Sequence, residues 1–409
     1  MDFKNYLVPG KTGLLIGIGG VSMSPLAEVL HDAGLDIRGS DMAESSNTLT
    51  LRERGIPIHI GHSADNVTDD ISFVIRTAAV HDDNPEVHEA HRRGIPVFER
   101  TQAWGALMRG YQNALCISGT HGKTTTTSMC THIMMAAEKD PTVMIGGTLP
   151  LLKACHRVGK GNTIIMESCE YYNSFLALNP TIAVVLNIEA DHLDFFKDLE
   201  DIKHSFRCFA ERVPAETGTV IANYDDANTM DALRGIARKV ITFGLNAKAD
   251  VYAQNIVHRG SVSEFDIYHR GNYFARVTLH VPGIHNVRNA LAATAAAIVL
   301  GVSPNAVKYG LAGFEGAGRR FDFKGKFQGA DLYDDYAHHP SELRALLDAV
   351  DTLNYQRTIV VFQPHTYSRT AKLFNDFVEQ LRRPTIVYLA EIYAAREKNT
   401  IGISSADLA

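Results

Sequence analysis

The sequence predicts an α/β protein built from three domains, each with a mainly parallel sheet. Its 409 residues are too many for one typical core. Short apolar runs alternate with helical stretches, and this alternation requires crossover connections that favour parallel sheets. The alternation restarts after Arg109 and again near residues 316–323, so we expect domains over residues 1–109, 110–317 and 318–409.

The composition excludes several classes of protein. Hydrophobic residues make up 45% of the chain and charged residues 21%, which is typical of a globular protein. The net charge of −6 gives no bulk attraction to nucleic acid, so any anion site must be built locally. The longest apolar run, Ala290–Leu300, is too short for membrane insertion, and no signal peptide is indicated. Five scattered cysteines indicate reduced, buried thiols and a cytoplasmic protein.

The first domain is predicted to begin with a strand, a helix and a second strand. Expected strands are the runs 12–18, 35–41, 72–80 and 95–100. The stretch 24–34 is predicted to be a helix ending at Gly34, because glycine is favoured just beyond a helix.

The second domain has near-continuous apolar runs, the pattern of strands covered on both faces. They span residues 114–118, 142–147, 162–168, 181–188, 218–223 and 239–244. Residues 264–281 alternate around a Gly271–Asn272 turn, which predicts an appended hairpin. We expect one helix from about Asn289 and another from Pro304, capped by Ser303.

The third domain returns to alternation. Helices separate the stretches 331–340, 358–365 and 385–393. Near the end, Ser404 or Ser405 is placed as the N-cap of a helix that does not develop. We therefore expect this domain to be incomplete.

A glycine-rich turn after the run 114–118 opens a helix and suits a nucleotide phosphate. Glycines let the main chain approach an anion, Lys123 can contact the β- and γ-phosphates, and Thr124 offers a hydroxyl to Mg²⁺. The loop is shorter than usual, because Ile117 stands where the first glycine is expected. A helix start capped by threonines is the alternative. We expect an ATP or GTP site made by Gly119, Thr120, His121, Gly122, Lys123, Thr124 and Thr125.

A second glycine cluster follows the first strand. Gly17, Gly19 and Gly20 begin a dinucleotide-type turn, and Asp41 stands at the distance expected for a ribose-binding acid. Ser22 replaces the third glycine of the fingerprint, so the motif favours a diphosphate as much as NAD. A tight turn without a ligand stays open.

Acidic residues end two strands at the edge of the sheet that carries the phosphate loop. Glu167 ends one strand, and Asp191 and His192 follow another. Thr124, Glu167 and His192 are therefore candidate Mg²⁺ ligands. Histidine is an unusual ligand for this ion, so a hydrogen-bonding role for His192 is an equal alternative. Glu170 lies beyond the strand and is expected to face solvent.

Further polar residues lie near the second domain boundary. His285 and Asn289 are one helical turn apart and suit a purine edge, with helix capping as the alternative. Arg320 could approach a transferring phosphoryl group, although the pair with Arg319 could be merely solvated.

Two polar clusters follow strands of the third domain. The first contains Asp334, Asp335, Tyr336, His338 and His339, and the second contains His365 and Arg369. The chain has no G-x-S-x-G elbow of a serine hydrolase and no H-E-x-x-H zinc spacing.

Over essentially the whole chain, the motifs resemble those of the Mur ligase family. In order they are GIGGVSMSPLAEVL, GTHGKTTTT, ESCEYYNSFL, NIEADHLDFF, PGIHNVRNALAA, GAGRRFD, DDYAHHP and FQPHTYSRT. GTHGKTTTT alone would indicate the wider superfamily, which includes folylpolyglutamate synthetases. The resemblance implies Rossmann-like first and third domains and a P-loop ATPase-like central domain. It also implies an ADP-forming peptide ligase of peptidoglycan precursor synthesis that uses ATP and Mg²⁺.

The resemblance also implies roles for residues. Lys123, Arg320 and His338 would be catalytic, and Thr124, Glu167 and His192 would hold magnesium. ATP would contact the phosphate loop and His285, Asn289, Arg320 and Asp335. The UDP-sugar would contact Gly17, Gly19, Gly20, Ser22, Asp41, His62, His365 and Arg369.

Within the family, ESCEY…SFL and FQPHTYSRT favour, by resemblance alone, a member that joins L-alanine to UDP-N-acetylmuramate through an acyl phosphate. The alternatives are a relative that adds a muramyl tripeptide in recycling, a nicotinamide oxidoreductase, and a non-catalytic nucleotide-binding module. We expect a monomer or homodimer.

Overall fold

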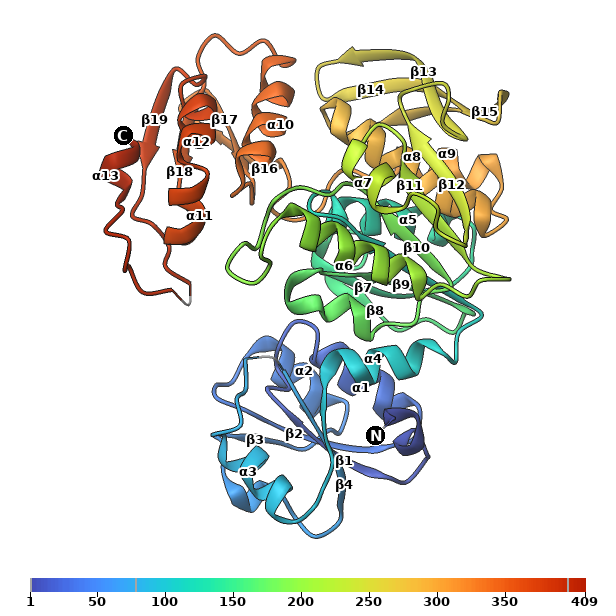
Figure 1. The fold of residues 1–409 in the computed structure, drawn as a ribbon, viewed down its shortest axis with the longest axis vertical. Coiled ribbons are helices and arrows are strands. Elements are labelled where there is room, and N and C mark those ends of the chain that lie inside the picture. Colours follow the sequence, from blue (N-terminus) through green and yellow to red (C-terminus); the bar gives the residue numbers. More distant parts are fainter. Residues whose placement is uncertain (1, 78, 396) are drawn as a thin grey trace.

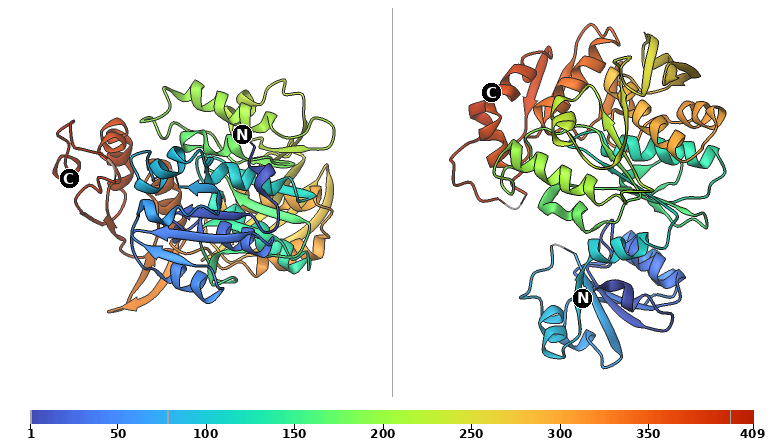
Figure 2. Two further views of the ribbon diagram at one scale, coloured as in Figure 1. Left: turned by 90° about the horizontal axis from the view of Figure 1, so that it is seen from below. Right: turned by 45° about the vertical axis from the view of Figure 1, so that its right-hand side comes forward.

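The computed structural model describes residues 2–77, 79–395 and 397–409. It contains three regions that follow one another along the chain (Figure 1). The N-terminal region lies at the bottom of Figure 1, the central region above it, and the C-terminal region beside the central one. The right-hand view in Figure 2 shows the same arrangement. The predicted α/β class with three sheet-containing regions is confirmed.

The N-terminal region is a five-stranded parallel sheet in the order β3-β2-β1-β4-β5. Its elements are β1 (Thr12–Ile16), α1 (Ser24–Asp32), β2 (Asp36–Asp41), α2 (Ser46–Glu53), β3 (Ile58–Ile60), β4 (Ile71–Arg76), α3 (Pro85–Arg92), β5 (Val97–Glu99) and α4 (Arg100–Met108), with 3₁₀ turns Phe3–Tyr6 and Ala64–Asn66. The strand order reverses between β1 and β4. The loop after β1 therefore lies where open α/β sheets bind ligands.

The central region has a ten-stranded sheet in the order β15-β14-β13-β12-β11-β10-β6-β9-β7-β8. Its strands are β6 (Asn113–Ser118), β7 (Thr142–Leu149), β8 (Ala154–Arg157), β9 (Thr163–Glu167), β10 (Ile182–Val185), β11 (Thr219–Asn223), β12 (Lys239–Gly244), β13 (Val251–Arg259), β14 (Val262–His269) and β15 (Asn272–Leu279). The β7–β8, β13–β14 and β14–β15 pairs are antiparallel, and the other pairs are parallel. Its helices are α5 (Lys123–Ala136), α6 (Leu199–Glu211), α7 (Ala227–Ala232), α8 (Ile284–Val299) and α9 (Pro304–Ala312), with a 3₁₀ segment at Tyr171–Ala177.

Two local predictions in the central region have different outcomes. The hairpin is confirmed, because β14 and β15 pair across Gly271, whose φ is 79°. The helix expected from about Asn289 begins earlier, at Ile284, directly after Gly283 with φ 93°. His285 and Asn289 are consequently both within the first two turns of α8.

The C-terminal region contains two small sheets. The strands β16 (Asp322–Phe327) and β17 (Ala330–Asp334) are antiparallel, whereas β18 (Ile359–Phe362) and β19 (Ile386–Leu389) are parallel. The helices are α10 (Pro340–Asp351), α11 (Tyr367–Lys372), α12 (Phe374–Leu381) and α13 (Ser405–Leu408). The expected strand–helix–strand alternation is present from β18 through α11 and α12 to β19. Ser404, one of the two predicted residues, is the N-cap of α13. The expectation that no helix develops there is wrong, since α13 forms a short helix over Ser405–Leu408.

The thiols and the apolar helices can be compared with the sequence expectations. All five cysteines are unpaired. Cys116 and Cys130 are buried as expected, but Cys169 is exposed and Cys155 and Cys208 are half-buried, so the expectation of buried thiols is wrong for these three. Among the described residues, no helix has both the length and the apolar character needed to cross a membrane.

Candidate active site

The phosphate loop joins β6 to α5, and its two glycines shape it. Gly119 has φ 143° and Gly122 has φ 85°. A Cβ atom on Gly122 would lie 2.7 Å from Asn289 Oδ1, and one on Gly119 would lie 2.8 Å from Leu186 Cβ. Both positions therefore exclude a side chain, and the main chain of the loop packs directly against the end of β10 and the start of α8.

Hydrogen bonds hold the middle of this loop. The N–H of Thr120 donates to Asn187 O at 3.0 Å, and the N–H of His121 donates to Asn187 Oδ1 at 2.8 Å. No side chain among the described residues caps the first turn of α5, where Thr125 lies. The amides of that turn are therefore available to an anion.

Lys123 contacts the loop itself and a buried acid. Its ammonium group donates to the carbonyl oxygens of Gly119 and Thr120 and lies 3.0 Å from Glu170 Oε2. The expectation that Glu170 faces solvent is wrong, since this residue is 2% exposed. Burial alone would lower the pKa of Lys123, but the charge of Glu170 outweighs this effect and raises it.

The predicted magnesium ligands are brought together in part. Thr124 Oγ1 donates to Glu167 Oε1 at 3.0 Å, so two oxygen donors of the kind Mg²⁺ prefers are adjacent. His192 approaches from another direction, with its Nε2 3.8 Å from Glu170 Oε1. Burial lowers the pKa of His192, which favours the neutral imidazole that a metal requires. Thr124 and Glu167 are therefore adjacent oxygen donors of the kind a divalent cation needs, whereas His192 lies beside Glu170.

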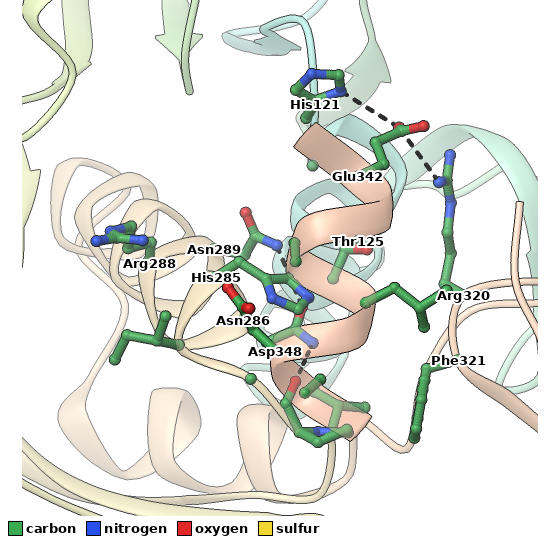
Figure 3. A pocket seen from close by; sticks show the side chains of 18 of the residues that line it. His121, Thr125, His285, Asn286, Arg288, Asn289, Arg320, Phe321, Glu342 and Asp348 are labelled. Atoms are coloured by element: carbon green, nitrogen blue, oxygen red, sulfur yellow. Dashed lines mark hydrogen bonds and ion pairs between the residues drawn. The ribbon is translucent and has the colours of Figure 1, made fainter. Parts of the chain in front are cut away.

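A cavity of about 620 Å³ lies next to the phosphate loop (Figure 3). The lining residues come from the loop, from the start of α8, from α10 and from the segments before β16 and after β17. They include His285, Asn289, Arg320 and Asp335. Burial lowers the pKa of His285 to about 4, so its ring is neutral and can hydrogen-bond a base. The sequence analysis missed Asn286, which lines the same cavity and whose Oδ1 accepts a hydrogen bond from Asn289.

The far side of the cavity is formed by the segment before α10. Asp335 accepts hydrogen bonds from the N–H groups of Phe321 and Ala337, both at 2.7 Å. Burial raises the pKa of Asp335. The first bond ties the residue before β16 to the segment after β17, and Arg320, next to Phe321, lines the cavity.

An ion cluster links the phosphate loop to the C-terminal region. His121 lies 3.4 Å from Glu189 Oε2 and 3.3 Å from Glu342 Oε1. Its ring nitrogens make no aligned hydrogen bond among the described residues, so the attraction is electrostatic. Burial lowers the pKa of His121, but these two carboxylates outweigh it and raise the pKa to about 9. Figure 3 shows His121 and Arg320 meeting at Glu342.

The two neighbouring histidines have opposite tautomers in their neutral forms. His338 Nδ1 lies 2.8 Å from the carbonyl oxygen of Tyr336, so it must donate, and its Nε2 carries the lone pair. His339 Nδ1 accepts from the N–H of Ser341 at 3.2 Å, so its Nε2 carries the proton. Although ligand atoms of His121, Glu189 and His339 lie within 4.8 Å of one another, this tautomer of His339 disfavours a metal there.

The N-terminal glycine loop is built around Asp41. Gly17 has φ 78°, and the N–H of Gly19 donates to Asp41 Oδ2 at 2.8 Å. A Cβ on Gly20 would lie 3.2 Å from Gly17 O, so the turn is tight. Ser22 Oγ accepts a hydrogen bond from Arg100.

Arg100 is a candidate binding residue that the sequence analysis missed. It is the first residue of α4, and burial lowers its pKa. Within the described ranges, its guanidinium forms no ion pair, although it lies at the glycine loop through Ser22. A cation in this state suits an anionic ligand. The sequence carries no motif around this arginine that would have signalled it.

The remaining residues predicted to contact the UDP-sugar lie in two different parts of the structure. His62 Nδ1 lies 2.7 Å from the fully buried Glu86, next to the N-terminal sheet. Arg369 instead pairs with Asp191 of the central region at 2.8 Å and lies 3.2 Å from His365. Burial raises the pKa of Asp191, but Arg369 outweighs this and holds it well below its usual value. His365 and Arg369 therefore lie near His192.

Family comparisons cover the three regions in order. Residues 15–112 match the model described as Mur ligase family, catalytic domain. Residues 117–297 match the Mur ligase middle domain, and residues 319–409 match the glutamate ligase domain of Mur ligases.

Individual relatives extend this similarity. A curated UDP-N-acetylmuramate–L-alanine ligase from Agathobacter rectalis is 47% identical over 96% of this chain and 86% of its own length. The crystal structure of UDP-N-acetylmuramate-alanine ligase MurC from Thermotoga maritima is 31% identical with a TM-score of 0.77, over 93% of this chain and 85% of that one. The structure of UDP-N-acetylmuramate:L-alanyl-γ-D-glutamyl-meso-diaminopimelate ligase from Neisseria meningitidis is 26% identical with a TM-score of 0.68, over 75% and 99%.

Proposed function

The chain belongs to the Mur ligase family, and from this premise we propose that it joins L-alanine to UDP-N-acetylmuramate with cleavage of ATP to ADP. The product would serve peptidoglycan synthesis. The observation that carries the proposal is the phosphate loop, where Gly122, Thr124 and Thr125 line the cavity. Lys123 follows Gly122 in this loop, and Thr124 contacts Glu167. Curated relatives with this activity in their names, at 42–47% identity, support the choice of substrates.

The reaction needs an activated carboxylate. A carboxylate is a poor electrophile at neutral pH, so its oxygen first attacks the γ-phosphorus of ATP. The bond from that phosphorus to the β,γ-bridging oxygen breaks, ADP leaves, and an acyl phosphate forms. Two anions must meet in this step, and Lys123 and Arg320 would reduce their repulsion and stabilise the transferring group. The ordered loop amides would hold the β- and γ-phosphates in line.

A magnesium ion would be held by Thr124, Glu167 and His192. When bound, it supplies positive charge that neutralises phosphate oxygens. Thr124 and Glu167 are already in contact, so this part of the site is organised before an ion arrives. Glu170 would be released from Lys123 when the phosphates take over the ammonium group.

The second step joins the amine of L-alanine to the acyl carbon and releases phosphate. The amine must be neutral to attack, and we assign His338 as the base that accepts its proton. The bond from His338 Nδ1 to Tyr336 O leaves Nε2 as the accepting atom. Closure of the C-terminal region over the cavity would exclude water and protect the acyl phosphate from hydrolysis.

The nucleotide sugar would bind at the N-terminal glycine loop. Gly17, Gly19, Gly20 and Ser22 offer a strand-to-helix turn, and Arg100 offers an unpaired charge for the diphosphate. Asp41 would accept from a ribose hydroxyl with the oxygen not used by Gly19. His62 follows β3 and lies 3.2 Å from the hydroxyl of Ser40, the residue before Asp41. His365 and Arg369 would face the muramyl or amino-acid end.

We place the enzyme in the cytoplasm, as a monomer or homodimer. Unpaired cysteines are typical of a reducing compartment. Both small-molecule substrates are polar and anionic or zwitterionic, so the enzyme needs neither a membrane nor nucleic acid as a partner.

Phosphate release from ATP tests the proposal. We expect release only when UDP-N-acetylmuramate and L-alanine are both present, with the amide product identified by mass spectrometry. Replacing L-alanine with a muramyl tripeptide tests the recycling alternative, because the product mass then differs. Binding of NAD(P)H with no alanine-dependent release from the folded protein would favour the oxidoreductase instead.

A further inference from the structure

We propose that Glu342 is a positioning residue that holds the cationic groups of the C-terminal region against the phosphate loop. This inference rests on the proposed function and deepens it. Glu342 is the third residue of α10, and its side chain is 13% exposed. Its contacts come from three separate segments of the chain.

The two carboxylate oxygens of Glu342 have different partners. Oε2 accepts from the N–H of His338 at 2.9 Å and from the N–H of His339 at 3.3 Å. This oxygen therefore completes the cap at the start of α10. Oε1 faces His121 Nδ1 at 3.3 Å and Arg320 Nη1 at 3.8 Å. One oxygen thus orders its own helix, while the other links the cavity-edge arginine to the loop.

The electrostatics favour this arrangement. Burial alone would raise the pKa of Glu342, but His121, His338 and Arg320 outweigh it and hold it well below its usual value. A buried carboxylate that stays ionised orients nearby cations strongly, because solvent screens them little. Among the described residues, the ion pair that Arg320 makes is the one with Glu342, and its guanidinium also lies 5.6 Å from the centroid of the Tyr336 ring.

Glu342→Gln separates the two tasks of the side chain. The amide oxygen can still cap α10, whereas the amide nitrogen replaces Oε1 and can no longer attract His121 or Arg320. We therefore expect a folded variant with an unchanged melting temperature. Its kcat should fall by about 10- to 100-fold without a rise in KM for ATP, because an interaction needed in the transition state is lost. Glu379→Gln, an exposed change on α12 in the same region, is the matched control.

A double-mutant cycle with Arg320→Ala distinguishes positioning from a purely structural role. If Glu342 acts through Arg320, the double variant should lose little more activity than Arg320→Ala alone. Independent losses that multiply, or an unchanged kcat in Glu342→Gln, would overturn the proposal.

Hydrogen exchange provides a readout that needs no turnover. In Glu342→Gln, amides of residues 119–125 should exchange at least about threefold faster, while those of α12 stay unchanged. Equal exchange in the loop would overturn the proposal even if the enzyme were inactive. Failure of the proposed function is separate, because it would appear as missing alanine-dependent phosphate release in the wild type.

Discussion

The two glycine loops of this protein have the same backbone plan but different surroundings. Each follows the first strand of its sheet, at a point where the neighbouring strands are parallel, and each contains a glycine with positive φ, Gly17 or Gly122. The central loop is surrounded by Lys123 with Glu167 and Glu170, whereas the N-terminal loop has one arginine, Arg100. The two turns expose backbone N–H groups in the same way, and among the described residues only the central one has acidic side chains beside it that suit a divalent cation.

Removing the ammonium group of Lys123 should have the largest effect on activity. This effect should concern ATP at the central loop and not the ligand of the N-terminal loop. We expect Lys123→Ala to lower kcat/KM for ATP by at least about 10³-fold, because no group replaces its charge at the transferring phosphoryl. Binding of UDP-N-acetylmuramate, measured by calorimetry, should be unchanged. An equal loss of affinity for both ligands would contradict the separation of the two loops.

Removing the charge of Arg100 at the N-terminal loop should weaken binding of the nucleotide sugar and leave ATP binding unchanged. Arg100→Ala should weaken UDP-N-acetylmuramate binding by about 10- to 100-fold, the value of a charge-assisted hydrogen bond to phosphate. ATP binding should stay as in the wild type. Arg100→Lys should recover part of the affinity, and calorimetry on the three proteins checks this. An unchanged affinity of Arg100→Ala for UDP-N-acetylmuramate would show that Arg100 does not bind this ligand.

A methyl group added to Gly122 of the central loop should lower the affinity for ATP more than it lowers the stability of the fold. In Gly122→Ala, the new Cβ would lie 2.7 Å from Asn289 Oδ1 at a φ of 85°, so the loop must move. We expect ATP affinity to fall by about 10-fold, from strain of about 1–3 kcal/mol. Gly235→Ala has a φ of 68° but open space around it, so it serves as the control for backbone strain alone. Equal ATP affinity in both variants would contradict the steric argument.

The smallest effect concerns the contact between helix α1, which follows the N-terminal glycine loop, and strand β8 of the central region. His156 Nε2 lies 3.1 Å from Glu28 Oε1. Burial lowers the pKa of His156, but hydrogen bonds with Cys155 and Glu28 outweigh it and raise the pKa to about 9. Because the folded-state pKa is raised, the added stability is complete below about pH 6.5 and is lost as pH rises through about 9.

His156→Gln should therefore lower the free energy of unfolding by about 1–2 kcal/mol at pH 6, and the difference from wild type should shrink by pH 9.5. Urea unfolding across this range measures it. The exposed His59→Gln is the control. A difference that is constant with pH would show that the charge of His156 has no part in it.

The sequence predicted the strands with strong apolar runs and the residues within motifs. It missed β3, β8, β13 and β16, because these strands are short or carry polar and exposed residues such as Lys324 and Lys326 of β16. Thr124 and Glu167 could be paired in advance, since both lie at the carboxyl edge of one parallel sheet.

Contacts between separate segments could not be predicted in the same way. Glu170 looks like a loop acid, and it is buried because the chain beyond β9 turns back over Lys123. The candidate roles of Arg100 and Glu342 depend on contacts with residues distant in sequence. Arg100 contacts Ser22, and Glu342 contacts His121. Local pattern carries no information about such neighbours, because tertiary packing alone brings them together.

The pairing of Lys123 with Glu170 has a consequence for inhibitor design. The lysine that a triphosphate mimic would target is already neutralised by an acid of the same protein, at 3.0 Å. A small anionic compound must first displace that internal competitor, and part of its affinity is lost in the exchange. Compounds anchored in the part of the cavity beside His285, away from Lys123, avoid this competition and are the better starting point.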